Sequence, residues 1–288
     1  MNQRPTSLRP TGALLNSAML NSAMLAGALL GGVLVSAPVS AQEDVRFGID
    51  VPYEPFVVRG ADGELSGFEI DLGNELCQRA ELECSWVEQG WDGIIPGLLA
   101  RKYDAILSSM AITPERERQV LFSLPYYNTP SVWITARDRD IDISDRESLD
   151  GLTVGVQRGT IRDVYVTEKY SDVLDIQRYG SSQDVVNDLQ AGRLDLTFED
   201  FPLAVEGIDF RDDDSPYKQL GDTIKTPTSI FGEGAAIAFR QRDEDLAEQF
   251  NAAICEVYAD GTFDALMEEY FDYDLSVRPS DADCAEYR

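Results

Sequence analysis

The chain contains no histidine in its 288 residues. Histidine is the commonest metal ligand in proteins and the side chain that most readily exchanges protons near neutral pH. Its absence excludes every Ser-His or Cys-His nucleophile scheme, although catalysis by carboxylates stays open. We therefore expect no metal site and no catalytic triad. We also expect no cofactor.

Basic residues are scarce. The chain has 24 lysines and arginines against 52 aspartates and glutamates, which gives a formal net charge of −28. A strongly acidic surface repels phosphate groups, so nucleic acids and anionic membranes are poor candidates as partners. We interpret the charge as a solvated, solubilising surface.

Long hydrophobic runs are confined to the N-terminus. Residues 1–41 carry Arg4 and Arg9 but no acidic residue, then an apolar run over Met24–Val35, and they end in Val39–Ala41. This pattern is typical of a secretory signal peptide cleaved at its C-terminal end. The apolar run is short for a bilayer span, so a retained anchor helix is the second choice. The pattern predicts an exported protein.

The chain has four cysteines, Cys77, Cys84, Cys255 and Cys284. In an exported chain they indicate two disulfides, and three pairings are formally open. We favour Cys77 with Cys84, which would join a helix end to the next strand, and Cys255 with Cys284, which would attach the C-terminal tail to a helix. A zinc site is the weaker interpretation, because no CxxC pair is present.

Short apolar runs alternate with helical patterns after residue 42, which predicts an α/β fold. The predicted strands are Val45–Ile49, Ala105–Ser108, Val132–Ala136, Val154–Val156, Asp175–Tyr179, Leu194–Phe198 and Ala235–Phe239. The predicted helices are Phe68–Arg79, Trp91–Ala100, Pro114 onward, Ile161–Lys169, Asp184–Ala191, Leu246–Tyr258 and Phe263–Tyr270. We expect Ser181 to cap the helix over 184–191 and Gly192 to end it. Residues 42–288 exceed what a single core usually holds, so two lobes are expected.

A cation stands at an unexpected place in the segment Ser108–Arg116. Thr113 is a typical N-cap and Pro114 a typical first helical residue, which puts Arg116 at the third helical position. The start of a helix is partly positive and ordinarily favours acidic residues there. A guanidinium beside free backbone N–H groups would make a strong carboxylate site. The alternative is a surface arginine paired with Glu115, Glu117 or another acid.

Two further strand ends carry candidate ligand groups. Asp200 follows a predicted strand at its carboxyl end, where open α/β sheets place ligand contacts, so it could receive an ammonium group. Its alternative role is the N-cap of a helix beginning near Phe201. In the turn Gly155–Ile161, Gly159 permits close backbone approach, and the N–H groups of Thr160 and Ile161 are available to an anion. This turn matches neither GxGxxG nor a P-loop, so nucleotide binding gains little support.

Several motifs occur together in a specific order. They are Asp50–Phe56, Gly67–Leu72, Trp91–Leu98, Ser108–Arg116, Gly155–Thr160 and Asp260–Phe263. In this order, and behind a leader, they resemble the bacterial extracellular solute-binding proteins of family 3, the amino-acid receptors of ABC importers. The resemblance spans nearly all of Val45–Asp274. It implies a two-lobed type II periplasmic-binding fold with a hinge between the lobes.

The resemblance also implies the roles of individual residues. Arg116 would take the α-carboxylate of the ligand together with N–H groups near Ala111 and Ile161, while Asp200 and the Ser109 carbonyl would take the α-ammonium. Relatives often have a serine where this chain has Ala111, so one polar contact is missing here. The complete implied set of ligand-binding residues is Asp50, Tyr53, Glu69, Trp91, Ser108, Ser109, Ala111, Arg116, Gln157, Thr160, Ile161, Glu199 and Asp200.

Within this set, Tyr53 and Trp91 would stack on the ligand side chain. Asp50, Glu69, Gln157 and Glu199 would surround its distal end. Three of these four are acids, and several carboxylates are costly to bury together unless a cation joins them. We therefore expect arginine, lysine, ornithine or histidine as ligand, with opines, glutamine and ectoine as alternatives.

The resemblance places one lobe at residues 42–129 plus 228–288 and the other at 130–227, with Arg116 and Asp200 on opposite lobes. A ligand bridging them would favour a closed form that a membrane permease can recognise. We expect a monomeric periplasmic protein with no enzymatic activity. The rivals are a cyclohexadienyl dehydratase on the same fold, with Glu199 or Glu69 as general acid, and a sensor domain.

Overall fold

The computed structural model describes residues 44–287. All of them belong to one unit of the chain, residues 41–288. The predicted signal peptide lies outside the described residues. Within residues 44–287, none of the helices has the length and the apolar character needed to cross a bilayer.

The first sheet contains five strands. In spatial order they are β4 (Glu83–Glu88), β1 (Asp44–Ile49), β5 (Ala105–Ile106), β12 (Ala238–Phe239) and β6 (Leu121–Phe122). β1 is parallel to β4 and β5, whereas β12 is antiparallel to β5 and β6. Phe47 of β1 lies between Trp86 of β4 and Phe250, with ring centroids 5.4 Å apart in both pairs. These aromatic contacts join the sheet to the helix that carries Phe250.

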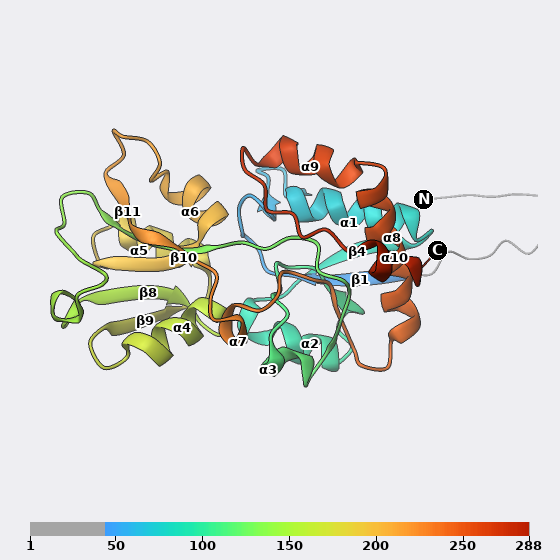
Figure 1. Cartoon of the computed structure of the whole chain (residues 1–288), viewed down its shortest axis with the longest axis horizontal. Coiled ribbons are helices and arrows are strands. Elements are labelled where there is room, and N and C mark those ends of the chain that lie inside the picture. Colours follow the sequence, from blue (N-terminus) through green and yellow to red (C-terminus); the bar gives the residue numbers. More distant parts are fainter. Residues whose placement is uncertain (1–43, 288) are drawn as a thin grey trace, which may run out of the picture. The chain divides into compact units, whose positions relative to one another are not determined.

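Helices and one hairpin surround this first sheet. The helices are α1 (Phe68–Arg79), α2 (Ile94–Leu99), α3 (Pro114–Glu117), α8 (Glu244–Ala259), α9 (Thr262–Tyr270) and α10 (Asp281–Ala285), with the 3₁₀ turn η1 (Trp91–Gly93) before α2. The hairpin pairs β2 (Val58–Arg59) with β3 (Leu65–Ser66). α1 packs against α8 and α9, and α10 packs against α8 (Figure 1).

The second sheet also contains five strands. In spatial order they are β11 (Tyr217–Ile224), β7 (Ser131–Ala136), β10 (Leu196–Asp200), β8 (Thr153–Gln157) and β9 (Asp175–Tyr179). β8 is parallel to β9 and β10, and β7 is antiparallel to β10 and β11. Around it lie α4 (Ile161–Tyr170), α5 (Ser182–Gln190), α6 (Phe201–Ile208), α7 (Thr228–Phe231) and the 3₁₀ turn η2 (Arg146–Leu149). The predicted α/β class with two sheet-bearing lobes is confirmed.

Local capping signals in the sequence agree with the helix ends. The Ser181 side chain accepts a hydrogen bond from the Asp184 N–H, which makes it the N-cap of α5. Gly192, just after that helix, has φ +69°, and Gly261, just after α8, has φ +83°. Positive φ at these positions is the usual helix stop, because glycine adopts it without steric cost.

Some boundaries differ from the prediction. The strand predicted over Leu194–Phe198 runs from Leu196 to Asp200, so Asp200 is its last residue rather than a residue beyond it. The predicted strand Ala235–Phe239 is reduced to Ala238–Phe239. β11 was not predicted, because most of its residues are exposed or half-buried and it lacks the alternation of apolar and polar residues that identifies a half-buried strand.

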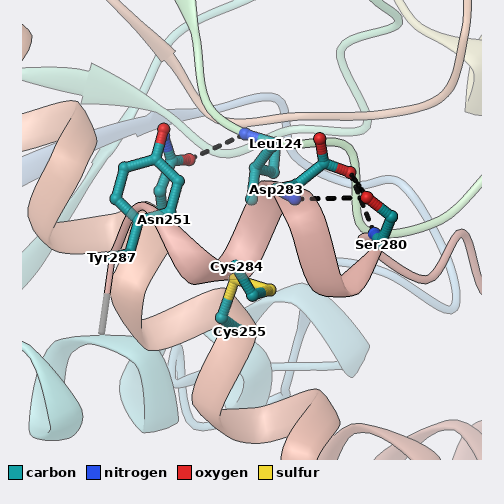
Figure 2. Close-up of a disulfide and its surroundings, with 7 residues drawn as sticks. All are labelled: Leu124, Asn251, Cys255, Ser280, Asp283, Cys284 and Tyr287. Carbon is teal, nitrogen blue, oxygen red and sulfur yellow. Dashed lines mark hydrogen bonds between the residues drawn. A yellow bond between two sulfur atoms is a disulfide. The ribbon is translucent and has the colours of Figure 1, made fainter.

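Both disulfides are those predicted. Cys77 of α1 bonds to Cys84 of β4, and Cys255 of α8 bonds to Cys284 of α10. Figure 2 shows the second bond joining the C-terminal helix to α8. α10 begins with a capping box, in which the Ser280 side chain accepts from the Asp283 N–H and the Asp283 carboxylate accepts from the Ser280 N–H. The short helix is therefore held at its start by its own residues and at its end by the disulfide.

Candidate functional site

A cavity lies where segments next to the first sheet meet the β8–α4 turn of the second sheet. The predicted residues that line it are Asp50, Tyr53, Trp91, Ser108, Ser109, Ala111, Arg116, Gln157, Thr160 and Ile161. Arg162 lines it as well and was not predicted. Glu69, Glu199 and Asp200 are not among the lining residues. Glu69 and Asp200 are bonded to residues that are, whereas Glu199 is bonded to Ser182 and to the N–H of Asp200. We call this cavity the central pocket.

The Arg116 side chain points into the central pocket. α3 begins as expected, with Thr113 as the N-cap accepting from the Arg116 N–H and Pro114 at the first helical position. Arg116 as a whole is only 9% exposed. Its Nη1 donates to the Ala111 carbonyl at 3.0 Å, and its central carbon lies 5.1 Å from the centroid of the Trp91 ring.

No carboxylate within residues 44–287 lies in ion-pair distance of Arg116. The alternative of a surface pair with Glu115 or Glu117 is therefore wrong. Burial, with a smaller contribution from the field of Arg162, lowers the pKa of Arg116 to about 10. Burying a cation without a counter-ion is costly, so this group is suited to receive an anion.

The turn between β8 and α4 faces Trp91. Gly159 has φ +74°, a conformation that glycine adopts readily, and its carbonyl accepts from the Trp91 indole N–H at 3.0 Å. The Gly159 N–H is already bonded to Asp163, and the Thr160 N–H makes a long bond of 3.4 Å to the Gln157 carbonyl. Ile161 is the first residue of α4, where an N–H group has no acceptor inside the helix. Of the two N–H groups expected to be free, that of Ile161 is the better placed.

Asp200 is occupied by two partners from different parts of the chain. Its Oδ2 accepts from the Tyr53 hydroxyl at 2.6 Å and from Nη2 of Arg162 at 2.5 Å. Asp200 is the N-cap residue of α6, as its alternative role predicted, but its side chain makes no capping hydrogen bond and stays available to other partners. Its Oδ1 is buried and has no hydrogen-bond partner among residues 44–287. This oxygen is the free part of the carboxylate.

Arg162 is the site residue that sequence reasoning missed. It is 8% exposed and lies in the first turn of α4. Burial disfavours its charge, but the fields of Asp200, Tyr53 and Glu199 and the hydrogen bond to Asp200 outweigh burial, so the pKa of Arg162 is raised. The signal that identified Arg116, a cation in the first turn of a helix, is also present at Arg162.

Asp50 is the acid that lines the central pocket. Its Oδ2 accepts from the Gln157 side chain at 2.6 Å, a contact between segments of the two sheets. Burial raises its pKa from 3.8 to about 6, and the bond to Gln157 opposes this rise. A cation placed beside Asp50 would favour its charged form.

Glu69 and Glu199 lie behind the pocket wall and are 0% and 1% exposed. Glu69 accepts from the Ser109 N–H at 2.7 Å and from the Tyr127 hydroxyl at 2.8 Å. Glu199 accepts from the N–H of Asp200 at 3.3 Å. Burial raises the pKa of each glutamate to about 7. Within residues 44–287 no group of three or more cysteine, aspartate or glutamate side chains is placed to hold a metal ion.

Comparisons with known proteins agree on one family. Residues 45–273 match the model of the bacterial extracellular solute-binding proteins, family 3. The chain is 40% identical over 82% of its length to the L-arginine-binding protein of Pseudomonas aeruginosa, covering 91% of that protein. It is 37% identical to the lysine/arginine/ornithine-binding periplasmic protein of Escherichia coli, over 81% of this chain and 89% of that protein. Among solved structures, an arginine-specific periplasmic binding protein of Salmonella typhimurium aligns with a TM-score of 0.71 and 30% identity, over 80% of this chain and 99% of that one.

Proposed function

We propose that this chain, which belongs to the bacterial extracellular solute-binding proteins of family 3, binds a basic amino acid in its central pocket for an ABC importer. The observation that carries the proposal is Arg116, a buried arginine that lines the central pocket and has no carboxylate partner among residues 44–287. The α-carboxylate of an amino acid supplies that partner. Relatives named for arginine, and for lysine, arginine and ornithine, support the basic class.

The carboxylate end of the ligand is proposed to lie between Arg116 and the start of α4. Arg116 would donate two charge-assisted hydrogen bonds, and the Ile161 N–H would donate another. The start of a helix adds a favourable dipole for an anion. The ammonium end would face the free Oδ1 of Asp200 and the Ser109 carbonyl.

The distal cation is proposed to lie beside Asp50, with Tyr53 and Trp91 on the flanks of the ligand. Asp50 lines the pocket and has a pKa raised to about 6 by burial, so a nearby cation would stabilise its charged form. Glu69 and Glu199 would add negative potential from behind the wall rather than touch the ligand. This arrangement favours arginine, lysine or ornithine over neutral amino acids.

Closure of two lobes around the ligand is part of the proposal. The lobe boundaries, residues 42–129 plus 228–288 and residues 130–227, would put Arg116 and Asp200 on opposite sides. Contacts that support such closure already link the two sides, namely Trp91 to Gly159 and Asp50 to Gln157. A ligand that binds both sides favours the closed form, which a permease can then distinguish. We place the protein in the periplasm, as a monomer.

Calorimetry with ligand-freed protein tests the proposal. We expect arginine, lysine or ornithine to bind, and citrulline, which has the shape of arginine but no side-chain charge, to bind at least about a hundredfold more weakly, because it leaves Asp50 unpaired. Equal affinities for arginine and citrulline would refute the basic-ligand assignment. Binding confined to acidic or neutral compounds would refute it as well.

The enzymatic alternative is a cyclohexadienyl dehydratase. Glu69 and Glu199, its candidate general acids, have pKa values near 7 but do not line the central pocket. A general acid must come within hydrogen-bonding reach of the reacting group. We therefore propose binding without turnover, and sustained product formation from prephenate or arogenate would refute it. A sensor role would be distinguished by the identity of neighbouring genes.

A further inference from the structure

Arg162 and Asp200 form the most deeply buried ion pair next to the central pocket. Their side chains are 9% and 1% exposed, and Nη2 of Arg162 lies 2.5 Å from Oδ2 of Asp200. The Tyr53 hydroxyl donates to the same Oδ2. This cluster joins α4 and β10 of the second sheet to the segment that follows β1 of the first.

The pair creates a conflict with the proposed ligand. An α-ammonium bound at Asp200 would stand close to the guanidinium of Arg162, and one carboxylate would then serve two cations. Two like charges a few ångströms apart repel strongly in a partly desolvated site. The free Oδ1 of Asp200 and the unpaired Nε of Arg162 indicate that the carboxylate and the guanidinium are not locked in a two-pronged contact.

We propose that Arg162 competes with the ligand ammonium for Asp200 and so limits the affinity for α-amino acids. The proposal rests on the proposed function, because it requires a ligand that carries an ammonium group. Binding then exchanges one cation for another at Asp200. The net binding free energy gained from the ligand ammonium is therefore small. Release of the ligand to a transporter is correspondingly easier.

The neighbouring charges give Arg162 a stabilising role at this place. Asp200 and Glu199 are consecutive buried acids at the end of β10. Without a cation nearby, two adjacent buried carboxylates destabilise each other. The positive charge of Arg162 offsets the negative charges of both carboxylates. The attraction that remains for a second cation is therefore weaker.

Two ligands and one substitution test the proposal. The ligands are arginine and deaminated arginine, which keeps the carboxylate and the guanidinium but lacks the ammonium group. In the wild type we expect them to differ in Kd by less than about tenfold, whereas removal of one partner from an uncontested buried charge pair costs about a hundredfold. In Arg162→Gln we expect arginine to bind about tenfold more tightly than in the wild type, with deaminated arginine unchanged.

Two control variants isolate the charge at this position. Arg162→Lys keeps a cation beside Asp200 and should keep the wild-type ratio of the two affinities. Arg158→Gln removes the same charge from the same turn, but Arg158 is 53% exposed and paired with Asp92, so both affinities should stay unchanged. Thermal unfolding of each ligand-free variant reports folding separately from binding. If Arg162→Gln does not fold, the wild-type ratio of the two ligands still decides the question.

The outcomes are distinguishable. A wild-type ratio above about a hundredfold, or an Arg162→Gln variant that binds arginine no more tightly, would overturn the competition while leaving the basic-ligand function intact. Equal tightening for both ligands would also overturn it, because the effect would not depend on the ammonium. A wild type that binds neither arginine, lysine nor ornithine would overturn the proposed function and this inference with it.

Discussion

Replacing Arg116 with methionine should abolish ligand binding and leave the ligand-free protein at least as stable as the wild type. Methionine preserves much of the length and apolar surface of the side chain but removes the charge. A structural arginine would behave in the opposite way, because its loss would leave a partner unsatisfied. The only hydrogen-bond acceptor of the guanidinium among the described residues is the Ala111 carbonyl.

The size of the expected stability change in Arg116→Met follows from the cost of burying the charge. Burial lowers the pKa of Arg116 from its usual value to about 10, so the folded state disfavours the charged form. At neutral pH, below the pKa of Arg116 in both the folded and the unfolded state, the whole cost is present and amounts to about 3 kcal/mol. It declines as pH rises above about 10. Loss of the bond to Ala111 and of the contact with Trp91 offsets about 2 kcal/mol of this. The net expectation is a gain of about 1 kcal/mol, or about 2–4 °C in Tm.

Binding should respond much more strongly. The ligand carboxylate would lose its charged partner, which costs about 3 kcal/mol or more and raises the Kd for arginine more than a hundredfold. Calorimetry measures the Kd, and scanning calorimetry measures the Tm with and without arginine. Saturating ligand at about a thousand times Kd should stabilise the wild type by about 4 kcal/mol and should not stabilise the variant.

Arg118→Met is the matched control. Arg118 follows the same short helix, is exposed and donates to the Pro114 carbonyl. We expect its substitution to change Kd by less than about twofold, since exposed contacts of this kind contribute little. Loss of more than about 2 kcal/mol of stability in ligand-free Arg116→Met, or an arginine affinity within tenfold of the wild type, would refute the reasoning.

Three other outcomes are expected. Asp200→Asn leaves Arg162 buried beside a neutral amide, so the ligand-free protein should lose about 3–5 kcal/mol of stability; an unchanged Tm would contradict this. Burial raises the pKa of Asp50 to about 6, and a cation bound beside it should lower that pKa. Binding of arginine should then release a proton, and the affinity should rise from pH 5 to 8. An affinity independent of pH would exclude Asp50 as the cation partner. Replacing Cys255 and Cys284 together by serine opens a loop between residues 29 positions apart and should cost about 3–4 kcal/mol of stability without changing arginine affinity. An equal Tm would show that other contacts hold the C-terminal segment, such as the hydrogen bond that Asn251 donates to the Tyr287 hydroxyl; both residues are labelled in Figure 2.

Local features of the fold could be predicted because they depend on residues a few positions apart. The Thr113 cap and Pro114 set the start of α3 and hence the backbone place of Arg116. Ser181 and Gly192 likewise bound α5. Motif order along the chain identified the family and, through it, most of the residues that line the central pocket. The edge strand β11 was missed, since few of its side chains are buried and its pairing with β7 supplies much of its structure.

Partners of the buried charges could not be predicted from the sequence. The contact between Tyr53 and Asp200 joins residues 147 positions apart, and the bond between Gln157 and Asp50 joins residues 107 apart. With 52 acidic residues available, no local pattern selects which one a given arginine meets. Glu69 was expected at the ligand but lies behind Ser109, because its carboxylate is bonded to that backbone N–H.

The sequence by itself determined the α/β class, the family, the helix starts and the cation at the first turn of α3. These features depend on backbone preferences and motifs that involve residues close together in the sequence. Only the tertiary structure decided that Arg116 has no carboxylate partner within residues 44–287, whereas Arg162 has Asp200. Both arginines lie in the first turn of a helix, where a cation is unfavourable. Their different partners depend on which side chains the fold brings together at the central pocket. Because both arginines are buried, the presence or absence of a counter-ion decides whether each one is stabilised within the protein or left to bind an anion.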